Sequence, residues 1–134
     1  MESELGKQLE ILRSYFNNYS TTLAVFLSNL FPGSSFRTYR NEVENLARKN
    51  STKMIDAFIL SALEFEEEIM SGDEEFFLGR RKGERERGTK TSFPKVLEFK
   101  SIWGKLTDEN KGVVKSYVQI LCSVARKYFD LSYQ

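Results

Sequence analysis

The residues of this chain most able to do chemistry lie in one short segment, DEEFFLGRRKGERERGTKTS, at residues 73–92. Three carboxylates run into two phenylalanines and then into an arginine-rich tract that is punctuated by glycine. Residues 64–75 contain seven acidic side chains and no basic one, whereas residues 80–90 contain six basic and two acidic side chains. Such a density of charge suits charge-assisted hydrogen bonds to a partner, or neutralisation of one half of the segment by the other.

For contact with a partner, the sequence favours the phenylalanines as an apolar anchor and the cations as hydrogen-bond donors. The predicted contact residues are Phe76, Phe77, Arg80, Arg81, Lys82, Arg85 and Arg87. The two phenylalanines are also expected to anchor the acidic turn onto the core, because large aromatic side chains are usually buried. A mobile, solvated loop over residues 79–92 is the alternative, since glycine-rich charged segments have the composition of disordered chains.

A protein partner is favoured over nucleic acid. Glu84 and Glu86 interrupt the basic tract, and no aromatic residue alternates with the arginines to stack on bases. Nucleic-acid binding through residues 80–90 therefore stays open as the less favoured alternative.

No set of residues indicates catalysis. Glu66, Glu67 and Glu68 are consecutive and point around a helix, so at most two could converge as an acid and base pair. The chain has no histidine, which leaves Cys122 without the usual activating base. GRRKGERERG lacks the spacing of a phosphate-binding loop, and SGDEEFF lacks the ligand spacing of a calcium loop. We expect a non-enzymatic protein with no cofactor and no metal site.

Length and composition set the frame that must position these residues. With 134 residues, of which 40% are hydrophobic, the chain can bury one core, so we expect a single domain over residues 1–134. Lys plus Arg number 20 and Asp plus Glu 19, so any electrostatic argument must be local. A single cysteine excludes an internal disulfide, and the charged start MESELGKQLE does not resemble a signal peptide. We expect an intracellular protein without a membrane span.

Hydrophobic periodicity predicts an all-α fold, a single compact helical bundle of about five helices. The predicted helices cover residues 3–31, 36–49, a third from 51 or 52 through 69, a fourth from 92–94 to 106, and a fifth from 107 to about 130. Proline and glycine in FPGS end the first helix, SFP starts the fourth, and Thr107 can cap the fifth. The charged loop falls between the third and fourth helices.

The first helix carries an apolar seam with alternating steps of four and three. Its members are Leu5, Leu9, Leu12, Phe16, Tyr19, Leu23, Phe26 and Leu30. We interpret the seam as core, because four other amphipathic helices need a surface to pack on. Two alternatives use the same pattern: a homo-oligomer through the seam at residues 5–30, and a groove that binds a partner's amphipathic helix.

Two blocks in the second half of the chain, IMSGDEEFFL at 69–78 and IWGKLTDENKGVVKSYVQIL at 102–121, resemble a pattern in short helical proteins of large nucleocytoplasmic DNA viruses. The matching positions are Ile69, Asp73, Glu74, Phe76, Phe77, Leu78, Trp103, Leu106, Asn110, Lys111 and Tyr117. Gly112 and Val114 depart from the pattern, which tends to carry bulkier residues there, and the first long helix is not covered.

This resemblance implies a viral context and no particular activity. Together with the absence of a catalytic motif, it predicts a viral protein that acts as a virion or assembly component through protein–protein contacts, with a viral or host protein as partner. The expected location is the host cytoplasm or the virion.

Overall fold

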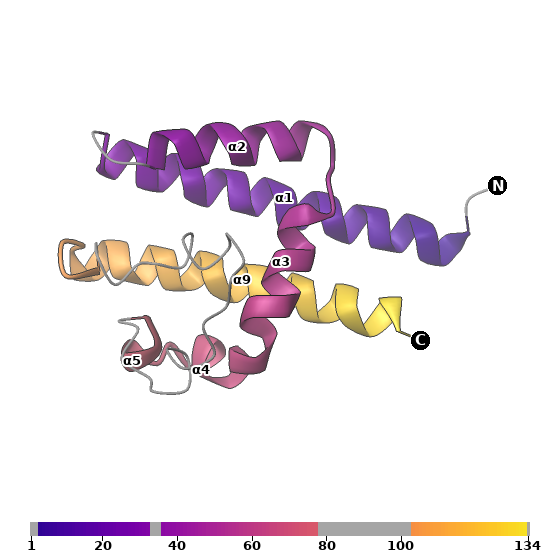
Figure 1. The fold of residues 1–134 in the computed structure, drawn as a ribbon. Helices are drawn as coiled ribbons and strands as arrows, with labels where there is room; N and C mark the ends of the chain where they lie inside the picture. Colours follow the sequence, from indigo (N-terminus) through magenta and orange to yellow (C-terminus); the bar gives the residue numbers. More distant parts are fainter. Residues whose placement is uncertain (1–2, 33–35, 78–102, 134) are drawn as a thin grey trace.

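The computed structural model describes residues 3–32, 36–77 and 103–133 of the chain (Figure 1). Its elements are α1 (Glu4–Leu30), α2 (Phe36–Arg48), α3 (Lys53–Ala62), the 3-10 turn η1 (Leu63–Phe65), α4 (Glu66–Ser71), α5 (Glu74–Phe77) and α9 (Asp108–Ser132). The described residues contain no strand, which confirms the predicted all-α helical bundle. The predicted loop at residues 79–92 and most of the predicted fourth helix lie outside the described residues.

The two long helices form the axis of the bundle. Figure 1 shows α1 and α9 running in opposite directions, so that the two ends of the chain lie at the same end of the molecule. The chain then turns back after α1, and α2 packs on α1 on the side away from α9. The helix α3 crosses both long helices, and α4 and α5 follow along α9.

The caps of the long helices follow the sequence. The Ser3 hydroxyl accepts a hydrogen bond from the Gly6 amide at 2.9 Å at the start of α1, and Pro32 lies just beyond its end. At the start of α9 the Thr107 hydroxyl accepts one from the Asn110 amide at 3.1 Å, as predicted. Asp108 and Glu109 lie in the first turn of α9, where the helix dipole stabilises negative charge.

The prediction of one continuous third helix through residue 69 was wrong. Backbone angles at Ala62 (φ −121°) and Phe65 (φ −105°) leave the helical region, and η1 joins α3 to a separate α4. The break redirects the chain along α9, which allows Ile69 to be buried as well as Phe58. The three consecutive glutamates thereby form the first turn of a new helix, where their charge is favourable.

The turn between α2 and α3 is held to α1 by side-chain amides. The buried Asn17 side chain donates to the Asn50 side-chain oxygen at 3.2 Å and to the Ser51 carbonyl at 3.0 Å. Arg13 donates to the Asn50 carbonyl at 2.9 Å, and Asn50 has a left-handed backbone with φ of 47°. Of the two predicted caps of α3, only Ser51 accepts a backbone hydrogen bond with its hydroxyl, from Lys53 at 3.1 Å.

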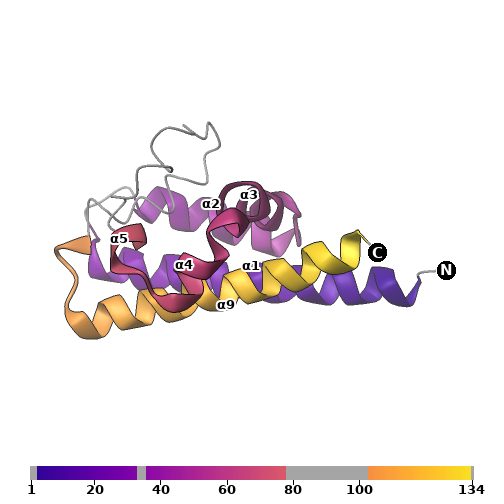
Figure 2. The same ribbon diagram turned by 90° about the horizontal axis from the view of Figure 1, so that it is seen from below.

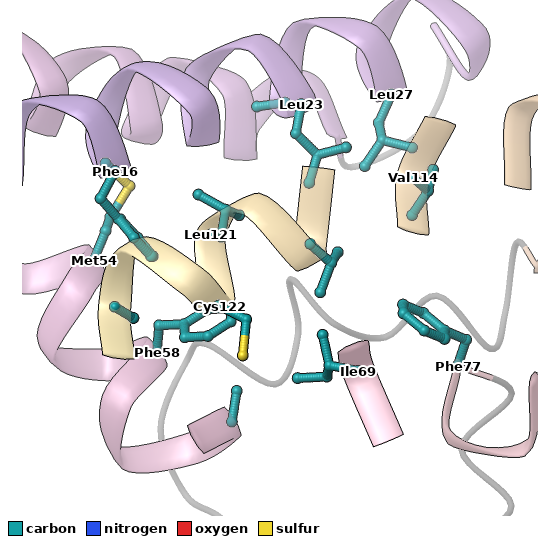
Figure 3. Close-up of a cluster of buried hydrophobic side chains, with 14 of the residues drawn as sticks. Phe16, Leu23, Leu27, Met54, Phe58, Ile69, Phe77, Val114, Leu121 and Cys122 are labelled. Carbon is teal, nitrogen blue, oxygen red and sulfur yellow. The ribbon is translucent and has the colours of Figure 1, made fainter. Parts of the chain in front are cut away.

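The core lies where α1, α3 and α9 meet. Figure 3 shows buried side chains of α1, α3 and α9 pointing toward one another, with Ile69 and Phe77 adjoining them. The rings of Phe16 and Phe58 pack edge to face, with centroids 5.4 Å apart. Complete burial of each such side chain contributes roughly 1.5–3 kcal/mol relative to an exposed one.

The seam on the first helix is core only in part. Phe16 and Leu23 are buried as predicted, but Leu5, Tyr19 and Leu30 are exposed. A strict repeat of 3.5 residues drifts by about 20° per heptad relative to a straight helix of 3.6 residues per turn. The buried stripe of α1 therefore departs from the seam and runs through Phe16, Asn17, Ser20, Leu23, Ala24, Leu27 and Ser28.

Candidate protein-docking groove

The two phenylalanines of the predicted contact segment anchor the segment to the body of the protein. Phe77 is almost completely buried and stacks on Trp103, with ring centroids 5.2 Å apart. Phe76 is half-buried between Phe65 and Phe77, at centroid distances of 5.5 and 5.3 Å. The anchoring role is thus observed, whereas contact of Phe77 with a partner stays a prediction that this burial disfavours. Arg80, Arg81, Lys82, Arg85 and Arg87 lie outside the described residues.

A polar cluster fixes the same segment to α9. The Trp103 indole N–H donates to one oxygen of the Glu74 carboxylate, and the Lys115 ammonium donates to the other at 2.9 Å. Lys111 lies 3.9 Å from the carboxylate, and both lysines lie within 6 Å of the Trp103 ring centroid. The pKa of Glu74 is lowered, most strongly by the hydrogen bond from the Trp103 indole and then by the two lysines. Lys111 and Lys115 of α9 therefore balance the negative charge of Glu74.

The two sequence blocks that resemble a viral pattern contact each other here. Glu74 and Phe77 come from the first block, and Trp103 and Lys111 from the second. Their common task in this chain is to hold α5 against the start of α9.

A groove crosses the exposed face of α9. Tyr15 and Tyr19 of α1 form one wall and Met70 of α4 the other. Four exposed or half-exposed residues on one face of α9 form the floor, Ser116, Gln119, Ile120 and Ser123, and Val124 completes the lining. The groove has a volume of about 510 Å³ and is open to solvent.

The wall formed by α4 is held in place by α9. The Gln119 side-chain amide donates to the Ile69 carbonyl at 3.2 Å and to the Met70 carbonyl at 3.3 Å. The Ser123 hydroxyl lies 4.0 Å from the Met70 sulfur. Gly72 then ends α4 with φ of 70°, a left-handed conformation that glycine adopts without strain. Met70 is thus fixed at the rim of the groove.

An ion pair between Arg126 of α9 and Glu66 secures the other end of α4. The Arg126 guanidinium donates two hydrogen bonds to Glu66, at 3.0 and 2.9 Å, and one to Asp130 at 3.3 Å. The hydrogen bonds to Glu66 raise the pKa of Arg126. Both ends of α4 are therefore tied to α9.

The lining combines exposed apolar side chains with an absence of charge. Tyr15 is 53% exposed, Met70 45%, Tyr19 37% and Ile120 36%. None of the lining side chains is charged. The centres of protein interfaces are depleted of charge and enriched in tyrosine and methionine. The arrangement is suited to docking a protein surface.

Sequence reasoning missed these residues, although a signal was present. No charged residue occurs between Arg13 and Arg37, nor between Lys115 and Arg126. The groove lies where these two uncharged stretches run side by side. Periodicity alone assigned Tyr19 to the core and did not consider Tyr15.

Reactive groups in the described part of the chain are few. Cys122 is buried, and burial raises the pKa of its thiol to about 11. Across residues 3–32, 36–77 and 103–133, no group of three or more acidic or cysteine side chains could hold a metal ion. Within the same ranges, no helix is long and apolar enough to cross a bilayer.

The fold and the groove together define an all-α helical bundle with an uncharged interhelical groove. Comparison of the chain with protein-family models, with curated proteins and with solved structures found no match.

Proposed function

We propose that this chain is a non-enzymatic protein-interaction module whose docking surface is the groove between α1, α4 and α9. The single observation that carries the proposal is the exposure of Tyr15, Tyr19, Met70 and Ile120 around one hollow without a charged side chain. Scattered exposed apolar residues need no explanation, but a contiguous group of them marks an interaction surface.

The dimensions of the groove favour a helix as the docked element. Ser116 and Ser123 are two turns apart on α9, which corresponds to about 10 Å along the helix axis. Their small side chains allow a second helix to approach closely, and the two walls would hold it on either side. Binding of an amphipathic helix in an apolar groove is a common recognition mode, with anchors three and four residues apart.

The residue types at the walls support a protein partner. Tyrosine supplies a large apolar surface with a polar tip, and methionine adapts its shape to the surface it meets. Neither Tyr15 nor Tyr19 donates or accepts a side-chain hydrogen bond with another described residue. Both hydroxyls are therefore available to a partner.

The resemblance to short proteins of large DNA viruses supplies the context of the proposal. Within that context, the module acts as a virion or assembly component, and its partner is a viral or host protein. In this proposal Arg80, Arg81 and Lys82 are a second contact region, which supplies charge-assisted hydrogen bonds to a protein partner.

The proposal is tested by affinity purification of the tagged protein from the cells that express it, with a nuclease-treated sample in parallel. We expect a defined protein partner that survives nuclease and is lost with Tyr19→Lys, which places a charge in the groove. Loss of all recovery after nuclease would support nucleic-acid binding through residues 80–90 instead. Replacement of Arg80, Arg81 and Lys82 by alanine measures separately how much the basic tract contributes to partner binding.

A further inference from the structure

We infer that the helix docked in the groove is α1 of a second copy of this chain, so that two copies form a two-fold symmetric dimer. The inference rests on the proposed function, because it assigns the occupant of the same groove. The inference goes beyond the proposed function because it identifies the partner as a second copy of the chain.

A symmetric dimer requires one face that is complementary to itself. The exposed side of α1 provides a ridge, since Ile11, Tyr15 and Tyr19 follow one another at intervals of four residues and are all exposed. The groove floor on α9, from Ser116 to Ser123, provides a hollow directly beside that ridge. Figure 2 shows α1 and α9 along one edge of the molecule, with α3 toward the opposite edge, so α3 does not cover this face. Each copy can thus place its ridge in the hollow of the other.

The distribution of charge favours a second copy over a different partner. In an interface between two identical faces, residues near the two-fold axis meet themselves or close neighbours, so a charge there would be repelled by its own copy. A different partner could instead complement such charges. The stretch from residue 14 to 36, which contains Tyr15 and Tyr19, and the stretch from 116 to 125, which contains the groove floor, have no charged residue; charged residues such as Arg13 and Arg126 lie just beyond them. An uncharged centre lets two identical faces meet without repulsion between equal charges.

The size of the face limits the area that a dimer could bury. Residues 14–30 of α1 extend over about 24 Å, and two adjacent helices are about 20 Å wide, which gives a footprint on the order of 500 Å². Stable complexes bury roughly 800 Å² per partner. We therefore expect a reversible dimer that forms in the micromolar range rather than an obligate one.

The test is sedimentation equilibrium of the purified full chain at protein concentrations from about 1 to 500 µM. The expected result is a mass that rises from 15.6 kDa toward twice that value as concentration increases. Tyr15→Lys is expected to weaken the association tenfold or more, because it would bury an unpaired charge in each half of the interface. Leu60→Lys is the matched control, because Leu60 is an apolar residue, 74% exposed, that lies on α3, away from the face.

Three outcomes distinguish this inference from the proposed function. Association that Tyr15→Lys weakens and Leu60→Lys leaves intact supports the dimer. A monomer at every concentration overturns it, and recovery of a different protein that depends on Tyr19 would then leave the proposed function standing. Association that Leu60→Lys weakens as strongly as Tyr15→Lys places the contact elsewhere and also overturns the inference. Circular dichroism of each variant verifies that the helices are retained.

Discussion

The ring of Phe77 lies nearly parallel to the indole of Trp103, with planes 17° apart and centroids 5.2 Å apart. Phe77 ends α5 and Trp103 lies five residues before the start of α9, so their contact joins two elements that are far apart in the sequence. The Glu74 carboxylate reinforces the contact by accepting the indole N–H. Phe77, Trp103 and Glu74 therefore hold α5 against the residues that lead into α9.

The contribution of this attachment can be measured by replacing Trp103. Trp103→Ala removes a completely buried ring and should lower the free energy of unfolding by about 3–5 kcal/mol. Trp103→Phe retains a stacking partner for Phe77 but loses the donor to Glu74, so its cost should be smaller. Urea unfolding followed by circular dichroism gives both values. Equal costs for the two variants would show that stacking contributes little.

The pH dependence of stability reports on Glu74. Its pKa is lowered in the folded protein, so it stabilises the fold above its unfolded pKa, and this contribution is lost as pH falls through the lower folded value. The wild type should exceed Glu74→Gln in stability at neutral pH, and the difference should shrink below about pH 4.3, the ordinary value for glutamate. Thermal unfolding of both proteins at a series of pH values from about 7 to about 2.5 measures this difference in stability. A difference that is independent of pH would mean that the carboxylate charge is not involved.

Two glycines give opposite predictions for the same substitution. Gly72→Ala should destabilise the protein by about 1–2 kcal/mol, since alanine is strained at the left-handed φ of 70°. A Cβ at Gly112, in the interior of α9, would meet no atom within 4 Å, so Gly112→Ala should stabilise by about 0.5–1 kcal/mol. Urea unfolding of the two variants side by side checks the signs. Stabilisation by Gly72→Ala would contradict the assigned end of α4.

Cys122 provides a probe of the packing between α9 and its neighbours. Its thiol is completely buried, and burial raises its pKa to about 11. At pH 8 a thiol reagent such as DTNB should therefore react with the native protein far more slowly than with the urea-unfolded chain. Rapid reaction of the native protein would indicate that α9 opens from α3 and α4 easily.

The sequence predicted those parts of the fold that depend on local chemistry. Thr107 caps α9 as expected. Val114, Val118, Leu121 and Ala125 are buried in α9 at intervals of three and four residues, the periodicity of an amphipathic helix. The break after Ala62 was not predictable, because no proline or glycine marks it there. The break depends on the burial of Ile69 against α9, which is a tertiary contact.

The candidate site was less accessible to sequence reasoning. Periodicity cannot separate a buried apolar residue from one that lines a groove, so Tyr19 was assigned to the core. Phe77 was correctly expected to anchor its segment. The predicted contact residues all lay between Phe76 and Arg87, and none was on α1. The absence of charge from residue 14 to 36 was visible in the sequence, and it indicates an uncharged exposed face once α1 is known to lie at the surface.

The most direct test of the account is photo-crosslinking with a benzoylphenylalanine placed singly at position 120 or at position 60. Ile120 lies on the floor of the groove, and Leu60 is more exposed but lies on α3. Irradiation in the cells that express the protein should give a discrete protein adduct from position 120 and none from position 60. An adduct from position 60 alone, or none from either position, would contradict the groove as the docking surface.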